Sequence, residues 1–211
     1  MATIPQPPLA LLFDLGGVVI DIDFERVLRA WQPLSARPLD ELRAAFCFDA
    51  HYERHERGEI GAEAYFAHLA ARLGLQASPA QVAAGWNAVF VGEIAQTTRL
   101  VQALRARVPC YAFTNTNATH QAEYTARYPG LHDAFERIFA SHEIGFRKPE
   151  RRAFAHVAQA MGVAPGAILF FDDSPANVEG ARAAGLQAAL VRTPEDVAAA
   201  LAAAGLAPGP F

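Results

Sequence analysis

Three short apolar runs in this sequence each end in polar side chains that can do chemistry. Asp14 follows the first run, and Asp172 and Asp173 follow the last. Thr114 and Asn115 end the run between them. In an open parallel sheet, ligands bind beyond the carboxyl ends of the strands. If these runs are neighbouring parallel strands, their polar ends form one site.

The carboxylates among these residues point to a cation. Carboxylates from two strands that meet at one edge repel each other unless a cation joins them, and oxygen-rich ligation selects Mg²⁺ over metals that prefer thiolates. Lys148 adds a positive charge in a loop after Gly145. A hydroxyl, backbone N–H groups and an ammonium beside a metal suit an anion with several oxygens, in practice a phosphoryl group.

Each residue also has a simpler structural explanation. Asp173 or Ser174 can cap the helix that follows them. Thr114 and Asn115 can form a turn, and Lys148 can be a solvated loop residue. The order and placement of all these residues along the chain, rather than any one of them, favour a site.

Four segments have the composition of strands buried on both faces. Each is short, apolar and bounded by polar or turn residues, at 9–13, 108–114, 167–171 and 187–191. Helical patterns lie between and after them, at 94–107, 118–128, 150–161, 175–184 and 194–204. This alternation predicts an α/β fold, a three-layer Rossmann-like parallel sheet covered by helices on both faces.

The region from about Phe24 to Val91 breaks the alternation. Its segments 24–31, 39–46, 49–57, 62–73 and 79–89 are helical in pattern, and none has the pattern of a strand. We expect an all-helical cap inserted after the first strand and lying over the carboxyl edge of the sheet. The predicted division is an α/β core of residues 1–23 plus 92–211 and a helical cap of residues 24–91.

The composition excludes several classes of protein. The 211 residues are 52% hydrophobic with a net charge of −4, which excludes a disordered tail and argues against nucleic-acid binding. No apolar stretch reaches the roughly 20 residues of a membrane-spanning helix. No basic residue precedes Arg26, as a secretory signal would require. We expect a soluble cytoplasmic protein, in which Lys148 is the only lysine among 18 basic residues.

Four ordered motifs resemble those of the haloacid dehalogenase (HAD) superfamily. They are Phe13–Ile20 (FDLGGVVI), Phe113–Thr116 (FTNT), Arg147–Pro149 (RKP) and Phe170–Asn177 (FFDDSPAN). The resemblance covers nearly the whole chain, and the helical insertion is similar to the C1 cap of that superfamily. The stretch His55–Ile60 (HERGEI), with Asp21–Phe24 before it, further resembles bacterial phosphatases that act on α-D-glucose 1-phosphate.

The resemblance implies a nucleophile and a metal site. It makes Asp14 the nucleophile, which forms an aspartyl-phosphate that water then hydrolyses. It assigns Mg²⁺ to the Asp14 side chain, the Gly16 carbonyl and Asp173. Asp172 would lie close by, in direct or water-mediated contact with the metal.

The resemblance also implies how the phosphoryl group is held. Thr114 and the backbone N–H groups of Leu15 and Asn115 would grip its oxygens. Lys148 would neutralise charge on both the nucleophile and the phosphoryl group. Phosphoryl transfer depends mainly on positioning and charge stabilisation, so this set is nearly complete.

Gly16 departs from the family pattern. Phosphatases of the superfamily usually carry a second Asp at this position, two residues after the nucleophile, which protonates the leaving oxygen. General acid catalysis worth roughly 10²- to 10⁴-fold is therefore absent from its usual place. The absence disfavours a phosphomutase, which needs this acid in both directions. Phosphonate hydrolases also lack the acid but need a cap lysine, and the predicted cap has none.

Residues of the predicted cap are candidates for the missing acid. His51, His55 and Glu56 can donate a proton, and Tyr52 and Arg57 can contact a sugar. We expect His55 and Arg57 to bind substrate. The alternative is that these residues form a solvated helix face or local ion pairs.

The sequence therefore predicts a Mg²⁺-dependent phosphatase, a phosphoric monoester hydrolase acting on a small phosphorylated metabolite. A sugar phosphate such as α-D-glucose 1-phosphate fits best, because an anomeric oxygen is less basic than an alcohol oxygen and needs the acid less. A catalytically weak HAD-like binding or regulatory protein is the alternative, and a 2-haloacid dehalogenase is a more distant one. No nucleic-acid or membrane partner is expected, and both a monomer and a homodimer remain open.

Overall fold

A five-stranded parallel sheet forms the centre of the molecule. The structure, a computed structural model, describes residues 7–207. The strands run in the order β5-β4-β1-β6-β7, and every neighbouring pair is parallel. Their bounds are β1 (Ala10–Phe13), β4 (Cys110–Thr114), β5 (Arg137–Ala140), β6 (Ile168–Asp172) and β7 (Gln187–Leu190). The predicted α/β fold with a parallel sheet is confirmed.

The position of β1 in the sheet decides which side chains meet. All residues of β1 and β6 are buried, as expected of strands covered on both faces. Phe13, the last residue of β1, pairs with Ala112 of β4 on one side and Phe171 of β6 on the other. Asp14 therefore leaves the sheet between the carboxyl ends of β4 and β6.

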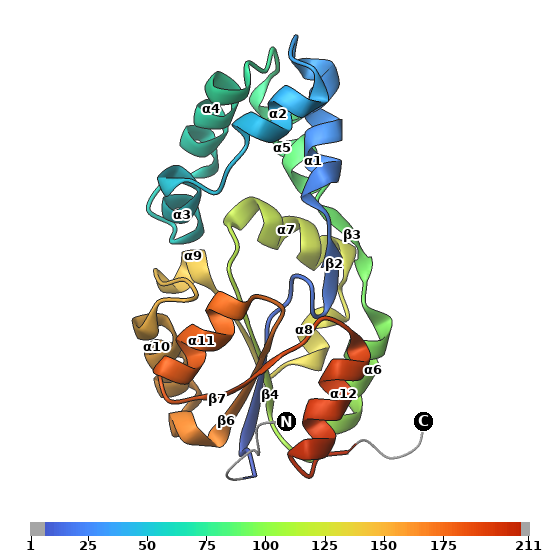
Figure 1. Cartoon of the computed structure of the whole chain (residues 1–211), viewed down its shortest axis with the longest axis vertical. Helices are drawn as coiled ribbons and strands as arrows, with labels where there is room; N and C mark the ends of the chain where they lie inside the picture. Colours follow the sequence, from blue (N-terminus) through green and yellow to red (C-terminus); the bar gives the residue numbers. More distant parts are fainter. Residues whose placement is uncertain (1–6, 208–211) are drawn as a thin grey trace.

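Helices cover both faces of the sheet, giving three layers (Figure 1). On one face, α6, α8 and α12 pack with Leu11 and Phe13. On the other face, α10 and α11 pack with Leu12 and Phe170. Successive strand residues point to opposite faces, so adjacent residues of β1 serve both layers. The helix bounds are α6 (Ala95–Leu104), α8 (Leu131–Ala134), α10 (Arg151–Met161), α11 (Pro175–Ala183) and α12 (Pro194–Ala203).

Five helices form a separate group beyond the carboxyl ends of the strands, at the top of Figure 1. They are α1 (Phe24–Trp31), α2 (Leu39–Ala45), α3 (Ala50–Glu56), α4 (Ala62–Leu73) and α5 (Pro79–Asn87). The chain enters this group through β2 (Ile20–Ile22) and leaves it through β3 (Phe90–Glu93), and these two strands pair antiparallel. Two further helices, α7 (Ala118–Arg127) and α9 (Ser141–Ile144), lie between the group and the sheet. We call residues 24–89 the cap segment.

Aromatic side chains hold the cap segment together. The rings of Trp31 and Trp86 stack with centroids 6.1 Å apart, and both residues are fully buried. Trp31 Nε1 donates a hydrogen bond to the carbonyl of Val82 at 3.0 Å. A Cβ at Gly85 would lie 2.2 Å from Trp31 Nε1, so only glycine allows α1 and α5 to approach this closely. The cap segment thus presents α3 to the sheet from a packed apolar core.

The structure adds elements that the sequence patterns do not predict. The ten predicted helices are all present, with ends that differ by at most three residues. The strands β2, β3 and β5 are additional, because each is only three or four residues long and has exposed positions that break an apolar run. Residues 1–6 and 208–211 of the predicted core lie outside the described residues. No helix within residues 7–207 is both long and apolar enough to cross a membrane.

Candidate active site

The carboxyl ends of β1, β4 and β6 open into a cavity of about 410 Å³ beneath α3. Its lining residues are Asp14, Gly16, Ile22, Phe48, Tyr52, Glu56, Thr114, Asn115, Arg147, Lys148, Pro149, Asp173, Ser174, Ala176 and Asn177. The polar ends of three strands therefore meet in space, as their common edge requires. Residues from the cap segment complete the wall opposite them.

Lys148 is buried at the base of this cavity between two carboxylates. Its side chain has no exposed surface, and its Nζ lies 2.8 Å from Asp14 Oδ1 and 2.7 Å from Asp172 Oδ2. The rings of Phe113 and Phe170 lie 5.5 Å and 5.4 Å from the same Nζ, within range of a cation–π contact. Burial alone would lower the pKa of Lys148, but the two carboxylates outweigh burial and raise it. Lys148 is therefore a charged residue of the site and not a solvated loop residue.

Asn115 fixes the loop that carries Lys148. Its Oδ1 accepts the backbone N–H of Lys148 at 2.8 Å, and its Nδ2 donates to the Lys148 carbonyl at 2.9 Å. On the other side of the loop, a Cβ at Gly180 would lie within 2.4 Å of the carbonyl oxygen of Pro149. Asn115 is thus more than a turn residue, because its amide side chain joins the end of β4 to the lysine loop.

Asp172 is fully buried, and both of its oxygens already have partners. Oδ1 accepts the Ser174 N–H at 2.8 Å, and Asn177 Nδ2 donates to Oδ1 and Oδ2 at 3.0 Å and 3.1 Å. Oδ2 also faces Lys148. Ser174 is the N-cap residue of α11, but its side chain makes no capping hydrogen bond. The carboxylates here are therefore not explained by helix capping, and Asp172 orients Lys148 and the start of α11.

The carboxylates of the site carry more charge than Lys148 can balance. Oxygens of Asp14, Asp172 and Asp173 lie within 4.8 Å of one another. Burial, reinforced by the neighbouring carboxylates, raises the pKa of Asp14 well above its usual range despite Lys148. Burial and the charge of Asp172 raise the pKa of Asp173 as well. One divalent cation would remove this repulsion.

The donors of this cluster suit Mg²⁺ and not a metal that prefers nitrogen or sulfur. All three side chains offer carboxylate oxygens, which are hard ligands. Gly17 has a φ of +75°, and a Cβ there would lie 2.3 Å from Asp173 Oδ2. Only glycine leaves this space beside the carboxylate open. The residues present therefore fit the cation that the sequence predicts.

Of the three predicted phosphoryl contacts, Thr114 and Asn115 line the cavity, whereas the Leu15 N–H already donates a hydrogen bond within the protein. Thr114, at the end of β4, lines the cavity and is 6% exposed. The Leu15 N–H donates to Asp14 Oδ1 at 2.7 Å. Leu15 is not among the residues that line the cavity. In this structure the Leu15 amide therefore orients the Asp14 carboxylate.

The two cap residues expected to bind substrate do not line the cavity. The ring of His55 is buried, stacks on Tyr65 with centroids 4.5 Å apart and places Nδ1 3.1 Å from the carbonyl of Ile60. Burial lowers its pKa, which favours the neutral ring. Arg57 instead forms ion pairs with Glu59 at 2.7 Å and with Glu150 at 3.0 Å. His55 is a packing residue here, and Arg57 ties α3 to the core.

Glu56 and Tyr52 are the polar residues of α3 that do line the cavity. Glu56 is 2% exposed, and Arg147 Nε donates to its Oε2 at 2.7 Å. Tyr52 also lowers the pKa of the same carboxylate, and so favours its charged form. Burial raises the pKa of Glu56, although Arg147, Tyr52 and Lys148 oppose the shift. A carboxyl group whose pKa is raised by burial therefore lines the same cavity as Asp14.

Sequence reasoning missed three residues that hold the site together. Arg147 bridges Glu56 and Glu53 of α3, at 2.7 Å and 3.2 Å. Asn177 binds Asp172, and Ile22 fills the space beside Gly16. Arg147 and Asn177 lie within the recognised motifs, but only the fold shows what their side chains contact. Ile22 lies within the Asp21–Phe24 stretch of the resemblance, but only the fold shows that its side chain faces the site.

Comparisons with known sequences agree with this arrangement. Residues 9–185 match a family profile described as haloacid dehalogenase-like hydrolase. A phosphatase of Mycobacterium tuberculosis is 30% identical over 192 residues, which are 86% of each chain. A D-ribitol-5-phosphate phosphatase of Bacteroides thetaiotaomicron is 22% identical over 173 residues, covering 80% of this chain and 84% of that one.

A solved structure is similar over most of both chains. It is a HAD family enzyme of Bacteroides thetaiotaomicron in complex with magnesium and inorganic phosphate. It superposes with a TM-score of 0.76 and 27% identity, covering 86% of this chain and 92% of that one.

The role of Lys148 is open to a direct stability test. Replacing it with Met keeps its approximate bulk but leaves two carboxylates buried without their cation. The free energy of unfolding at neutral pH should fall by about 3–5 kcal/mol, the usual cost of breaking a buried ion pair. The loss should shrink as the pH falls, because the pKa of Asp14 is already raised and protonation removes the unpaired charge. Urea unfolding at several pH values measures this.

Two further variants define the control and the contradiction for this test. Arg151→Met, on the exposed start of α10, should change stability by no more than about 0.5 kcal/mol. Adding Asp172→Asn to Lys148→Met should recover part of the lost stability by removing one of the two charges. A Lys148→Met protein as stable as the wild type at neutral pH would show that the buried contact is not as described.

Proposed function

The chain belongs to the haloacid dehalogenase-like hydrolases, and we propose that it hydrolyses a small sugar phosphate, with α-D-glucose 1-phosphate as the first candidate. The predicted phosphatase class is confirmed by this membership and by relatives named as phosphatases. The observation that carries the proposal is the buried Lys148 between Asp14 and Asp172, at the base of a cavity of sugar-phosphate scale.

Asp14 is the proposed nucleophile. Leu15 and Lys148 both bind its Oδ1, which leaves Oδ2 as the oxygen to attack phosphorus. In the first step a bond forms between that oxygen and phosphorus, and the bond from phosphorus to the leaving oxygen breaks. In the second step water attacks the aspartyl-phosphate, releases inorganic phosphate and restores Asp14. Lys148 offsets negative charge on the phosphoryl group in both steps.

The proposed magnesium ligands are Asp14, Asp173 and the backbone carbonyl of Gly16. Asp172 is less suited to direct contact, because Lys148, Ser174 and Asn177 already bind it. When bound, Mg²⁺ supplies charge neutralisation for the carboxylates and polarises the phosphoryl oxygens. Thr114 and the Asn115 N–H are proposed to hold the remaining phosphoryl oxygens.

Glu56 is proposed to replace the acid that Gly16 cannot supply. A Cβ at Gly16 would lie 2.9 Å from Ile22 Cδ1, so Ile22 occupies the space of a side chain at that position. Glu56 faces the same cavity from α3, and its pKa is raised by burial. Protonated Glu56 gives its proton to the leaving oxygen and then, as a carboxylate held by Arg147, takes a proton from the attacking water.

The missing acid at Gly16 also bears on the substrate. An anomeric oxygen is less basic than an ordinary alcohol oxygen, so it departs with less help from an acid. Hydrolysis of a sugar 1-phosphate therefore depends less on protonation of the leaving oxygen by a residue of the cap segment than hydrolysis of a sugar 6-phosphate does. The name of one relative, a D-ribitol-5-phosphate phosphatase, supports a sugar-sized substrate without deciding its identity.

Gly16 is also the observation that favours the second candidate, a weakly catalytic binding or regulatory protein. Such a protein would bind phosphate and Mg²⁺ but release little phosphate. The cluster of Asp14, Asp172 and Asp173 argues against the dehalogenase alternative, because halide displacement needs no metal to hold these carboxylates together.

Release of inorganic phosphate tests the proposed function. We expect turnover of α-D-glucose 1-phosphate with Mg²⁺, slower turnover of glucose 6-phosphate, and at least a 10³-fold loss in Asp14→Asn, roughly the scale of removing a covalent nucleophile. EDTA should abolish turnover. Turnover should decline as the pH falls and Asp14 becomes protonated, because both the nucleophile and the metal ligands must be ionised. Tight phosphate binding with negligible release would instead support the binding protein.

The proton donor is tested by substrates with different leaving groups. Glu56→Gln should slow hydrolysis of a sugar phosphate with an alcohol leaving group, such as glucose 6-phosphate, by roughly 10²- to 10⁴-fold. It should slow hydrolysis of an aryl phosphate far less, since a phenolate leaves without protonation. In the wild type, sugar-phosphate turnover should decline as the pH rises through the raised pKa of Glu56. The Glu56→Gln protein should lack this decline.

Glu53→Gln is the matched control, because Glu53 also pairs with Arg147 but is not among the cavity-lining residues. It should retain both activities and the pH profile. Equal losses on the aryl and alkyl substrates in Glu56→Gln would rule out a proton donor and leave Glu56 with a role in packing or cap position only.

A further inference from the structure

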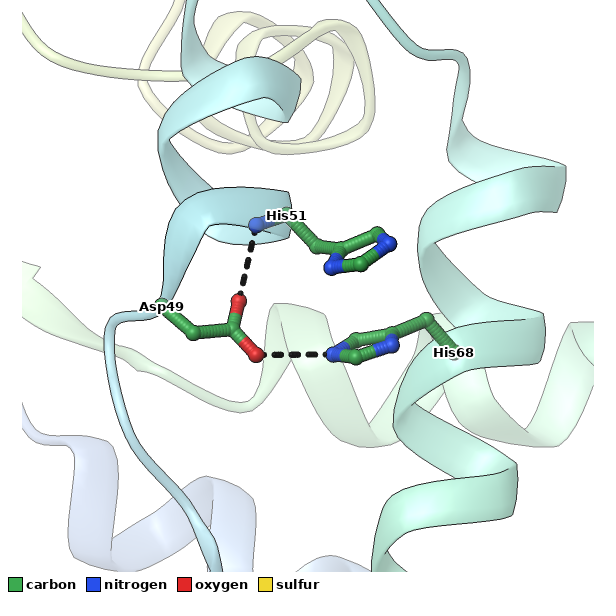
Figure 2. A group of neighbouring side chains, drawn as sticks. All are labelled: Asp49, His51 and His68. Carbon is green, nitrogen blue, oxygen red and sulfur yellow. Dashed lines mark hydrogen bonds and ion pairs between the residues drawn. The ribbon is translucent and has the colours of Figure 1, made fainter.

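Three metal-ligating side chains meet on the cap segment, outside the cavity. They are Asp49, the N-cap residue of α3, His51 on α3 and His68 on α4 (Figure 2). One ligand atom from each lies within 4.8 Å of the others. Asp49 Oδ2 is 2.8 Å from His68 Nε2, and the two imidazole rings stack with centroids 3.9 Å apart. Neither the family resemblance nor the proposed phosphatase reaction uses these residues.

We propose that Asp49, His51 and His68 bind a divalent transition-metal ion such as Zn²⁺. Two imidazole nitrogens and one carboxylate oxygen form a donor set that zinc accepts, with water in a fourth position. Bonds of about 2.0–2.2 Å place tetrahedral ligands roughly 3.5 Å apart, so the three atoms must move slightly closer together. Because the two imidazole rings are nearly parallel, at 11°, one ring must also turn so that its nitrogen lone pair points at the ion. The nitrogens also distinguish this site from the all-oxygen cluster in the cavity, which suits Mg²⁺.

The ligand atoms are available without dismantling α3. Asp49 Oδ1 accepts the backbone N–H groups of His51 and Tyr52, both at 3.0 Å, and so keeps its capping role. Oδ2 is then the ligand, and Figure 2 shows the two histidine rings stacked one above the other beside that carboxylate, with the His68 nitrogen facing Oδ2. His51 is exposed and His68 is half-buried, so the ion has access from solvent.

Arg72 would compete with a metal ion for Asp49 Oδ2. Its Nη1 lies 3.3 Å from Asp49 Oδ2, where it would repel an incoming cation. Its Nε donates to the carbonyl of Ala45 at 2.6 Å, and 38% of the side chain is exposed. The guanidinium can therefore turn towards water while the rest of the side chain stays in place. Removing its charge should strengthen metal binding.

Metal binding would join the N-terminal end of α3 to α4, whereas Glu56 lies at the C-terminal end of α3. Because α3 carries Tyr52 and Glu56 to the cavity, the ion would restrict where the proposed acid lies. This consequence rests on the proposed function, but the binding itself does not. The site would make the cap segment sensitive to a second, chemically distinct cation.

Zinc titration of the full chain tests the site. Every protein carries Asp173→Asn, which weakens binding at the catalytic carboxylates, and is first stripped with a chelator. Competition with a chromogenic zinc indicator should show one zinc per chain. The zinc affinities of the His51→Gln and His68→Gln variants should each fall by more than the roughly 10- to 100-fold that loss of an outer-shell residue costs. Arg72→Gln should bind more tightly.

His132→Gln is the matched control, since this exposed histidine on α8 contacts only Thr125 among the hydrogen bonds of the described residues. It should bind zinc as the parent does. Cobalt substitution gives a second readout, because tetrahedral nitrogen ligation produces visible absorption that His68→Gln should lose. Stoichiometric zinc in the His51→Gln/His68→Gln double variant, or no stoichiometric zinc in the parent, would overturn the proposal. Either result leaves the phosphate-release test unaffected.

Discussion

The buried contact of Lys148 with Asp14 and Asp172 is the interaction on which the rest of the site depends. An ammonium without exposed surface is stable only beside opposite charge, and here two carboxylates lie 2.7–2.8 Å from it. This contact requires β1 and β6 to be neighbours, which the sheet order provides. It also requires a fixed loop, which Asn115 provides through both atoms of its amide. The fold and the charges of the site therefore support each other.

The same contact leaves the site with excess negative charge, and that excess connects stability to function. A third carboxylate, Asp173, lies close by, and burial raises the pKa of Asp14 and Asp173. A cation that relieves this repulsion also prepares the site for a phosphoryl anion. The proposed acid, Glu56, comes from the cap segment, so proton transfer depends on how α3 sits. The Arg147–Glu56 and Arg57–Glu150 pairs hold α3 against the core in this structure.

The sequence predicts most of the fold, because its helices have a clear periodicity and its buried strands are continuous apolar runs with polar ends. It does not predict β5 or the β2–β3 pair, whose short runs are partly exposed and are stabilised by pairing with distant strands. The motif residues Asp14, Thr114, Asn115, Lys148 and Asp173 are predicted and do meet at one cavity. The substrate contacts of the cap segment are harder to predict, because neighbouring residues at the end of α3 face different ways. Glu56 lines the cavity, whereas His55 and Arg57 do not. Only tertiary packing decides that rotation.

Trapping the covalent intermediate tests the central claim, that Asp14 at the Lys148 centre is the nucleophile of a phosphatase. Wild-type protein mixed with Mg²⁺ and a hydrolysed sugar phosphate is quenched in acid during turnover, and its peptides are mapped by mass spectrometry. The account predicts one phosphoryl group on the peptide that contains Asp14, located on that side chain and absent in Asp14→Asn. A phosphoryl group on another residue, or undiminished phosphate release by Asp14→Asn, would contradict it.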